Sequence, residues 1–153
     1  MIAVLQRVYN ASVSADGEPA GQIGRGLYIL LGVMKGDTEN DAVLLAEKIS
    51  KCRIFSDEND KMNLSVNDIN GEALVVSNFT LGANYAHGNR PDYFNSAHPS
   101  VAEELYNLFK SELALRVRRV ESGVFGADMR TDMSTDGPVT IVMDSAVLKG
   151  GSK

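Results

Sequence analysis

The sequence is poor in several features that would point to particular classes of protein. It has one cysteine, Cys52, so no disulfide can form within the chain, and its start lacks the basic and long apolar segments of a secretory signal; we therefore expect a cytoplasmic protein. No apolar run approaches the ~20 residues needed to cross a bilayer, and we expect no membrane association. The net charge of -5 argues against nonspecific coating of nucleic acid, which depends on many cationic contacts with phosphates. An enzyme that contacts only the end of a nucleic acid is still allowed, since basic residues cluster within 48–61 and 116–119.

Familiar motifs for cofactors, metals and nucleophiles are also absent. The two histidines, His87 and His98, fall in one predicted loop, and no Cys/His cluster exists, so we expect no zinc site. No glycine-rich dinucleotide or phosphate loop and no GxSxG motif occurs, so we expect no cofactor. Cys52 continues the apolar stripe of a predicted helix, which favours a core residue over a nucleophile.

The pattern that is present predicts one mixed α/β domain over residues 1–153. A hydrophobic fraction of 44% is enough for one core at this length. Alternating or continuous apolar runs predict strands, and stripes at helical spacing predict two helices, beginning after Thr38 and at Pro99. The Asn70-Gly71 pair is a hairpin signal. We expect mostly antiparallel sheet with both helices packed on one side. The predicted strands cover residues 1–15, 27–33, 53–55, 73–81, 116–121, 124–133 and 139–144.

Two short segments have no obvious role in such a core. Residues 77–81 (Ser-Asn-Phe-Thr-Leu) place polar side chains at the end of a strongly apolar strand, where backbone N–H groups also become free. Residues 136–140 (Asp-Gly-Pro-Val-Thr) combine a glycine with a proline, a pair that permits unusual backbone geometry. Taken singly, each segment is explained by a strand end or a turn.

Taken together, the two segments resemble the D-aminoacyl-tRNA deacylase family, whose signatures read SQFTL and NxGPVT. Two positions differ from these signatures: Asn78 stands for the usual glutamine, and Thr135 stands for the usual asparagine. Asn78 keeps the amide but loses one methylene. The resemblance continues along nearly the whole chain, at residues 1–3, 6–8, 11–13, 21–24, 30–33, 53–57, 61–64, 90–91 and 125–129.

The resemblance implies an enzyme that hydrolyses the ester joining a D-amino acid, or glycine, to the 3′-terminal adenosine of tRNA. It also implies a homodimer with β/β/α layers and an active site at the subunit interface. There, Gly137 and Pro138 of one subunit, joined by a cis bond, reach the other subunit and exclude L-amino acids by steric clash. Arg7 would hold this Gly-Pro loop in place.

On the catalytic side, the resemblance points to the segment from Ser77 to Thr80. We favour backbone N–H groups around Phe79 and Thr80 as an oxyanion hole, because no base is assured beside Thr80 to make it a nucleophile. Phe79 would also shape the adenosine pocket, and Asn78 and Met129 are further candidates for substrate contact.

Two alternatives stay open at this point. One is a related tRNA proofreading deacylase with altered amino-acid specificity, for which the departures at Asn78 and Thr135 leave room. The other is a noncatalytic RNA-end or protein-binding module on the same scaffold.

Overall fold

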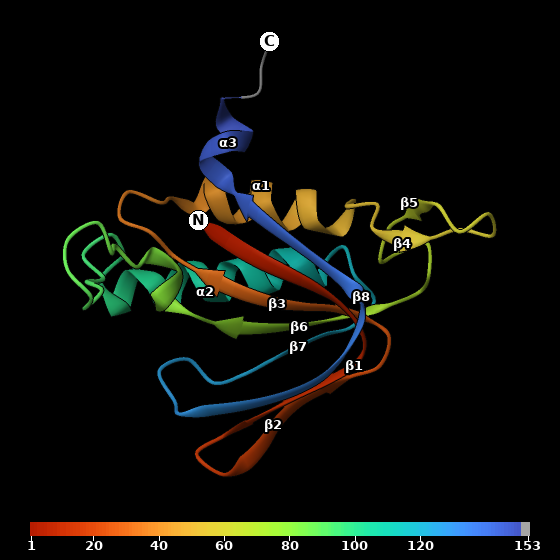
Figure 1. Cartoon of the computed structure of the whole chain (residues 1–153), viewed down its shortest axis with the longest axis horizontal. Coiled ribbons are helices and arrows are strands. Elements are labelled where there is room, and N and C mark those ends of the chain that lie inside the picture. The colour runs from red at the N-terminus through yellow and green to blue at the C-terminus, as the bar shows by residue number, and fades with distance from the viewer. Residues whose placement is uncertain (151–153) are drawn as a thin grey trace.

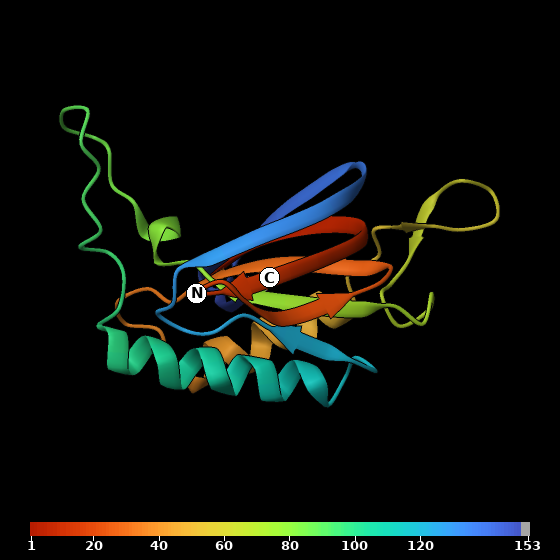
Figure 2. The same cartoon turned by 90° about the horizontal axis from the view of Figure 1, so that it is seen from below.

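The computed structural model describes residues 1–150, which form a curved sheet with helices on one face (Figures 1 and 2). The main sheet has six strands, and a separate two-stranded sheet lies beside it. In chain order the elements are β1 (Ile2–Ala15), β2 (Glu18–Ile23), β3 (Gly26–Gly32), α1 (Glu39–Ser50), β4 (Phe55–Ser56), β5 (Met62–Leu64), β6 (Glu72–Ser77), the 3₁₀ turn η1 (Phe79–Gly82), α2 (Pro99–Ala114), β7 (Val120–Ser122), β8 (Met129–Asp144) and α3 (Ser145–Lys149).

The long strand β1 organises the antiparallel part of the sheet. One edge of β1 pairs with β3 along residues 2–8 and with β2 along residues 11–15. Its other edge pairs with β8 from end to end, so both edges of β1 are covered. The predicted long strand at the start of the chain is therefore confirmed.

The other half of the sheet is parallel, which the sequence pattern did not predict. Strand β6 pairs with β3 and β7 pairs with β6, both in parallel, and the chain crosses over through α1 and α2. Parallel neighbours need such long crossovers, whereas a tight turn joins only antiparallel strands. The hairpin prediction at Asn70-Gly71 is thus wrong. Asn70 does adopt a positive φ of 52°, but the strand that follows it enters the sheet beside β3.

Helices α1 and α2 cover one face of the sheet, as predicted (Figure 2). Thr38 precedes α1, and both its N–H and its hydroxyl donate to the Asp41 carboxylate at 2.8 and 2.9 Å. The apolar stripes of both helices are buried against the inner residues of β1, β3 and β6. The largest fully buried side chains of this core include Leu45, Ile49, Tyr106, Phe109 and Leu5.

Several elements differ from the sequence-based expectation, and the strands predicted over residues 53–55 and 116–121 are Phe55–Ser56 and Val120–Ser122. The strand predicted up to residue 81 ends at Ser77, and η1 begins at Phe79. Residues 124–128 form a turn, and the last strand, β8, starts only at Met129 and continues through the Gly-Pro pair. A third helix, α3, follows β8 directly, whereas two were expected.

Candidate active site

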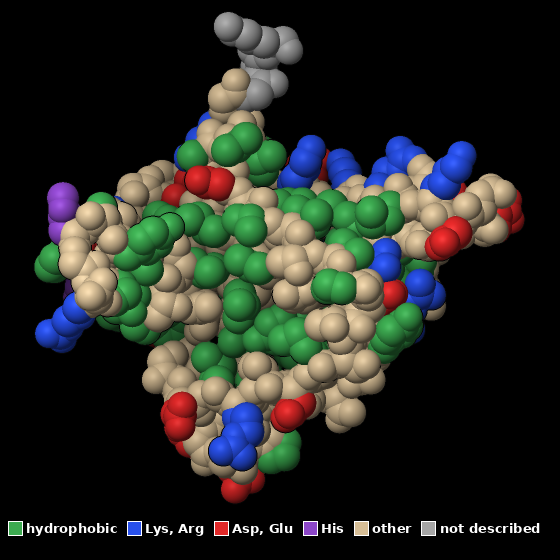
Figure 3. Space-filling model, in the orientation of Figure 1, with side chains coloured by type: hydrophobic (Ala, Val, Ile, Leu, Met, Phe, Trp, Pro, Cys, Tyr) green, Lys and Arg blue, Asp and Glu red, His purple; other side chains and the backbone are tan. Residues whose placement is uncertain are grey.

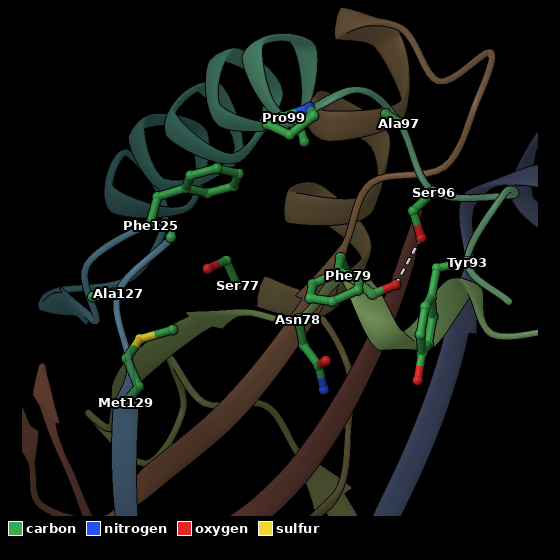
Figure 4. A pocket seen from close by; sticks show the side chains of 12 residues that line it. Ser77, Asn78, Phe79, Tyr93, Ser96, Ala97, Pro99, Phe125, Ala127 and Met129 are labelled. Carbon is green, nitrogen blue, oxygen red and sulfur yellow. Dashed lines mark hydrogen bonds between the residues drawn. The ribbon is translucent and has the colours of Figure 1, made fainter. Parts of the chain in front are cut away.

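A cavity of about 500 Å³ lies beyond the carboxyl end of β6 (Figure 4). Three segments that are far apart in the sequence enclose it. They are the end of β6 with η1, the stretch that leads into α2, and the turn before β8. The lining residues are Ser77, Asn78, Phe79, Tyr93, Ser96, Ala97, Pro99, Ala102, Phe125, Gly126, Ala127 and Met129.

The first wall changes direction at Asn78. The Asn78 side-chain oxygen accepts a hydrogen bond from the backbone N–H of Thr80 at 3.2 Å and a second one from the Thr80 hydroxyl. Asn78 therefore caps the short turn that it begins, a common use of asparagine. The described residues offer no hydrogen-bond acceptor to the N–H of Phe79. The free backbone donor of this wall is therefore Phe79, while the donor groups of Thr80 are occupied.

The second wall fixes η1 from outside. The Ser96 hydroxyl donates to the Phe79 carbonyl oxygen at 2.7 Å, and the Phe79 and Tyr93 rings meet edge to face at 5.1 Å (Figure 4). Gly82 lies directly beneath Ser96, and a β-carbon at Gly82 would lie 2.4 Å from the Ser96 oxygen. Close packing of these residues thus holds the Phe79 backbone in one position.

The third wall is the turn from Phe125 to Met129. The Phe125 ring packs on Tyr106 of α2 at 5.8 Å, and the Tyr106 hydroxyl donates to the Val75 carbonyl of β6 at 3.0 Å. Burial raises the pKa of Tyr106 to about 12, so this hydroxyl stays protonated at neutral pH. Met129 lies on the opposite side of the cavity from Tyr93 (Figure 4).

Tyr93 is the one titratable side chain among the residues that line the cavity. None of its lining residues is Asp, Glu, Lys, Arg, His or Cys. His98 lies just outside it, where it caps α2 and contacts the Ser100 hydroxyl at 2.9 Å. Within residues 1–150, no group of three or more metal-ligating side chains gathers. This wall can therefore bind a neutral, partly aromatic group and can donate backbone hydrogen bonds.

Arg7 and the Gly-Pro segment form a second constellation, at a different place on the fold. Gln6 pairs with Thr140 and Val8 pairs with Thr135, so residues 136–139 bulge out of β8 opposite Arg7. We call these four residues the 136–139 bulge. The Gly137–Pro138 peptide bond is cis, and Gly137 has a φ of 132°, which favours glycine.

Arg7 donates three hydrogen bonds, and two of them hold the 136–139 bulge. The Arg7 Nε donates to the Asp136 carbonyl at 3.2 Å, and a terminal nitrogen donates to the Asp136 carboxylate at 3.1 Å. The other terminal nitrogen donates to the Ile54 carbonyl at 2.7 Å. Arg7 is only 8% exposed, whereas Gly137 and Pro138 are exposed.

The structure thus divides the predicted site residues into two groups. Ser77, Asn78, Phe79 and Met129 line one cavity, and Thr80 lies beside it. Arg7, Gly137 and Pro138 are not part of the cavity wall of the same chain.

Sequence reasoning missed Tyr93, Ser96 and Phe125 as cavity residues. Tyr93 and Ser96 belong to a long irregular stretch, and only their long-range contacts bring them to the site. Phe125 belongs to a tag of the resemblance, which was the one available signal.

Cys52 fits the core interpretation. It is half-buried against the main hydrophobic core. Burial raises the pKa of its thiol, with nearby Lys48 opposing the shift only in part. A raised pKa reduces the thiolate fraction and makes Cys52 a poor nucleophile.

The chain is similar in sequence to several known proteins. The family model described as D-Tyr-tRNA(Tyr) deacylase matches residues 4–144. A D-aminoacyl-tRNA deacylase of Persephonella marina is 52% identical over 148 residues, covering 97% of this chain and 100% of the relative. One of Akkermansia muciniphila is 53% identical over 146 residues, covering 95% and 97% of the two chains.

Two solved structures share the fold. A structure titled c-Myc DNA Unwinding Element Binding Protein has a TM-score of 0.88 and 40% identity, covering 94% of this chain and 98% of that chain. A structure titled as a probable eukaryotic D-amino acid tRNA deacylase has a TM-score of 0.80 and 15% identity, which supports the fold alone, and it covers 93% and 97% of the two chains. The family match spans both constellations described above. The chain therefore belongs to the D-Tyr-tRNA(Tyr) deacylase family, a family of hydrolytic enzymes.

Proposed function

We propose that this protein hydrolyses the ester bond of D-aminoacyl-tRNA, and of glycyl-tRNA, releasing free tRNA and the amino acid. The observation that carries the proposal is the neutral cavity at the end of β6, where Ser77, Phe79 and Met129 converge and no Asp, Glu, Lys, Arg, His or Cys lines the wall. Family membership gives the reaction class, and the relatives' names give the substrate. A cytoplasmic location, where charged tRNA is found, fits this substrate.

The cavity suits the 3′-terminal adenosine. An unpaired base is commonly held by stacking on aromatic side chains, and Phe79 is 61% exposed at the cavity edge. Phe79 and Tyr93 are already in contact, so the aromatic surface is fixed before the nucleoside arrives. A nucleoside carries no charge, which matches a wall without charged side chains.

Catalysis then rests on geometry more than on side-chain chemistry. The Phe79 N–H is the donor that would stabilise the oxyanion formed when water attacks the ester carbonyl. The Ser77 hydroxyl faces the same cavity (Figure 4) and can hydrogen-bond the substrate. The Thr80 hydroxyl and backbone N–H are both bonded to Asn78, so Thr80 contributes by fixing the shape of the turn. The ribose 2′-OH next to the ester would help activate water, because the enzyme offers no base in the wall.

Chiral selection requires the 136–139 bulge of a second copy. In one chain, Gly137 and Pro138 are exposed and lie outside the cavity wall. A homodimer would place this pair against the substrate's α-carbon in the partner's cavity, with Arg7 keeping it rigid. A rigid backbone rejects every L side chain in the same way, and glycine passes because it has none.

The face that carries β1 and β8 is suited to pair with a second copy. Apolar side chains gather over this face (Figure 3). The exposed apolar residues of β1 and β8 include Tyr9, Met133 and Val142, which are 56%, 36% and 68% exposed. Exposed apolar groups of this kind favour protein association.

The deciding experiment is deacylation of matched D-Tyr-tRNA, L-Tyr-tRNA and Gly-tRNA without added metal. Loss of the D-tyrosyl and glycyl esters with the L-tyrosyl ester spared supports the proposal. Loss of the L ester as well would favour a proofreading deacylase of altered specificity. That alternative is compatible with Asn78, whose side chain caps the turn that begins after it. No turnover of any ester would favour a noncatalytic nucleic-acid-binding module.

A further inference from the structure

A hairpin-like segment rises from the body of the protein beside the cavity (Figure 2). It runs over residues 84–96, which we call the rim segment. Its base is closed by Asn84 and Asp92, whose backbones exchange hydrogen bonds at 2.8 and 2.9 Å. The Asn84 side-chain amide also donates to the Asp92 carboxylate at 3.0 Å. The rim segment is therefore held at its base by paired backbone and side-chain contacts.

The rim segment exposes large aromatic side chains. Tyr85 is 77% exposed and Phe94 is 75% exposed. The Lys35 ammonium lies 6.0 Å from the centre of the Phe94 ring. The backbone N–H of Lys35 donates to the Asn95 carbonyl at 2.8 Å, which holds the backbones that carry the cation and the ring side by side. An exposed aromatic next to a cation is the combination that binds single-stranded nucleic acid.

The rim segment is continuous with the cavity. Tyr93 and Ser96 line the cavity, and Phe94 stands between them in the chain. Residues 93–96 form a turn in which the Ser96 N–H donates to the Tyr93 carbonyl at 3.0 Å, so Phe94 lies at the corner of the chain. Tyr93 accordingly packs on Phe79 inside, while Phe94 is presented outside. A strand that leaves the cavity thus meets Phe94 and Lys35 next.

We propose that the rim segment binds the unpaired nucleotides that precede the terminal adenosine of the tRNA. Phe94 stacks on one of their bases, Tyr85 offers a second stacking surface, and Lys35 contacts a phosphate. This inference rests on the proposed function. Charge supports this inference as well as shape. The cavity wall has no cationic side chain, so the cations that contact the phosphates of the entering strand must lie outside the cavity.

The test compares two substrates with one variant. Phe94→Ala is assayed on D-Tyr-tRNA and on D-tyrosyl-adenosine, which carries the ester and the terminal nucleoside but no further nucleotide. Loss of one base stack is expected to lower kcat/KM on the tRNA by roughly 5- to 150-fold, mainly through KM. Turnover of the adenosine ester should not change, and Phe94→Tyr should restore the tRNA reaction. Leu115→Ala, which removes another side chain that is 78% exposed, is the matched control and should change neither.

A second measurement concerns the cation. For uncharged tRNA, the slope of log Kd against log salt concentration should fall by about 0.7 in Lys35→Ala, as expected for one lost contact to a single strand. An unchanged slope would overturn the role of Lys35.

The outcomes separate this inference from the proposed function. If the wild-type protein cleaves neither substrate, the proposed function fails. If it cleaves both and Phe94→Ala matches it on both, the rim inference alone is wrong. An equal fall on both substrates would also overturn it, because Phe94 would then support the cavity itself. A changed oligomeric state with unchanged tRNA kinetics would assign the rim segment to a protein contact instead.

Discussion

Replacing Arg7 tests whether its guanidinium holds the 136–139 bulge. In Arg7→Met the three hydrogen bonds to Asp136 and Ile54 are lost, while the aliphatic part of the side chain is kept. The Arg7 and Asp136 side chains are only 10% and 14% exposed, so the remaining carboxylate is largely cut off from water. Breaking a buried pair from one side costs about 3–5 kcal/mol. Because some water reaches Asp136, we expect a loss near the lower end, about 3 kcal/mol.

The assay is equilibrium urea unfolding at a fixed protein concentration, since association would add to the apparent stability. Arg130→Met is the matched control, because Arg130 is exposed on the same strand β8, and it should change the free energy of unfolding by no more than about 0.5 kcal/mol. Adding Asp136→Asn to Arg7→Met removes the stranded charge. The free energy of unfolding lost in the double variant should therefore be about 1–2 kcal/mol smaller than the sum of the losses in the two single variants.

Arg7→Met should affect the discrimination between D- and L-aminoacyl-tRNA more than it affects turnover of the D substrate. The cavity is built without Arg7, so hydrolysis of D-Tyr-tRNA should persist in the folded fraction. A loosened Gly137-Pro138 pair should admit L-Tyr-tRNA and lower the D-to-L ratio of kcat/KM. A stability loss below about 1 kcal/mol together with an unchanged ratio would refute the reasoning.

Three further predictions follow from the site and the core. Thr80→Ala should keep most of the kcat, because its hydroxyl is bonded to Asn78; a loss above about a thousandfold in single-turnover assays would instead favour a nucleophile. Cys52→Ala should retain activity, and the Cys52 thiol should be alkylated more slowly than a free thiol at pH 8; fast labelling would contradict its burial. Stability should fall at both pH extremes, as followed by urea unfolding. Burial disfavours the charged form of Asp41, yet hydrogen bonds from Lys149, Ser145 and Thr38 outweigh it and lower its pKa well below the ordinary value, so this contribution is present above about pH 4 and is lost as the pH falls. Burial raises the pKa of Tyr106 to about 12, so its contribution is present below about pH 10 and is lost as the pH rises toward 12; in Tyr106→Phe the alkaline loss should be smaller.

Local sequence signals predicted the elements whose ends are set by local chemistry. Thr38 and Pro99 correctly marked the starts of two helices, because capping and the missing proline N–H act within one turn. The alternation over residues 1–15 gave the first strand for the same reason. Parallel pairing of β3 with β6 could not be read in this way, since it depends on how α1 crosses over the sheet.

The candidate site shows the same division. The two signature segments could be found in the sequence, since each is a short run with an unusual composition. Their distant partners were not visible in the local pattern: Arg7, 129 residues from Asp136, was indicated only by the resemblance, and Ser96, which reaches Phe79 across 17 residues, was missed.

The sequence by itself determined the family, the helical starts and the residues with no role in the core. Only the tertiary structure decided that Gly137-Pro138 forms a bulge within a strand instead of a turn before it, and that this bulge lies outside the cavity wall of its own chain. The physical reason is that β1 pairs with β8 on both sides of Arg7. This long-range pairing sets the register of β8 and forces the four intervening residues out of the ladder.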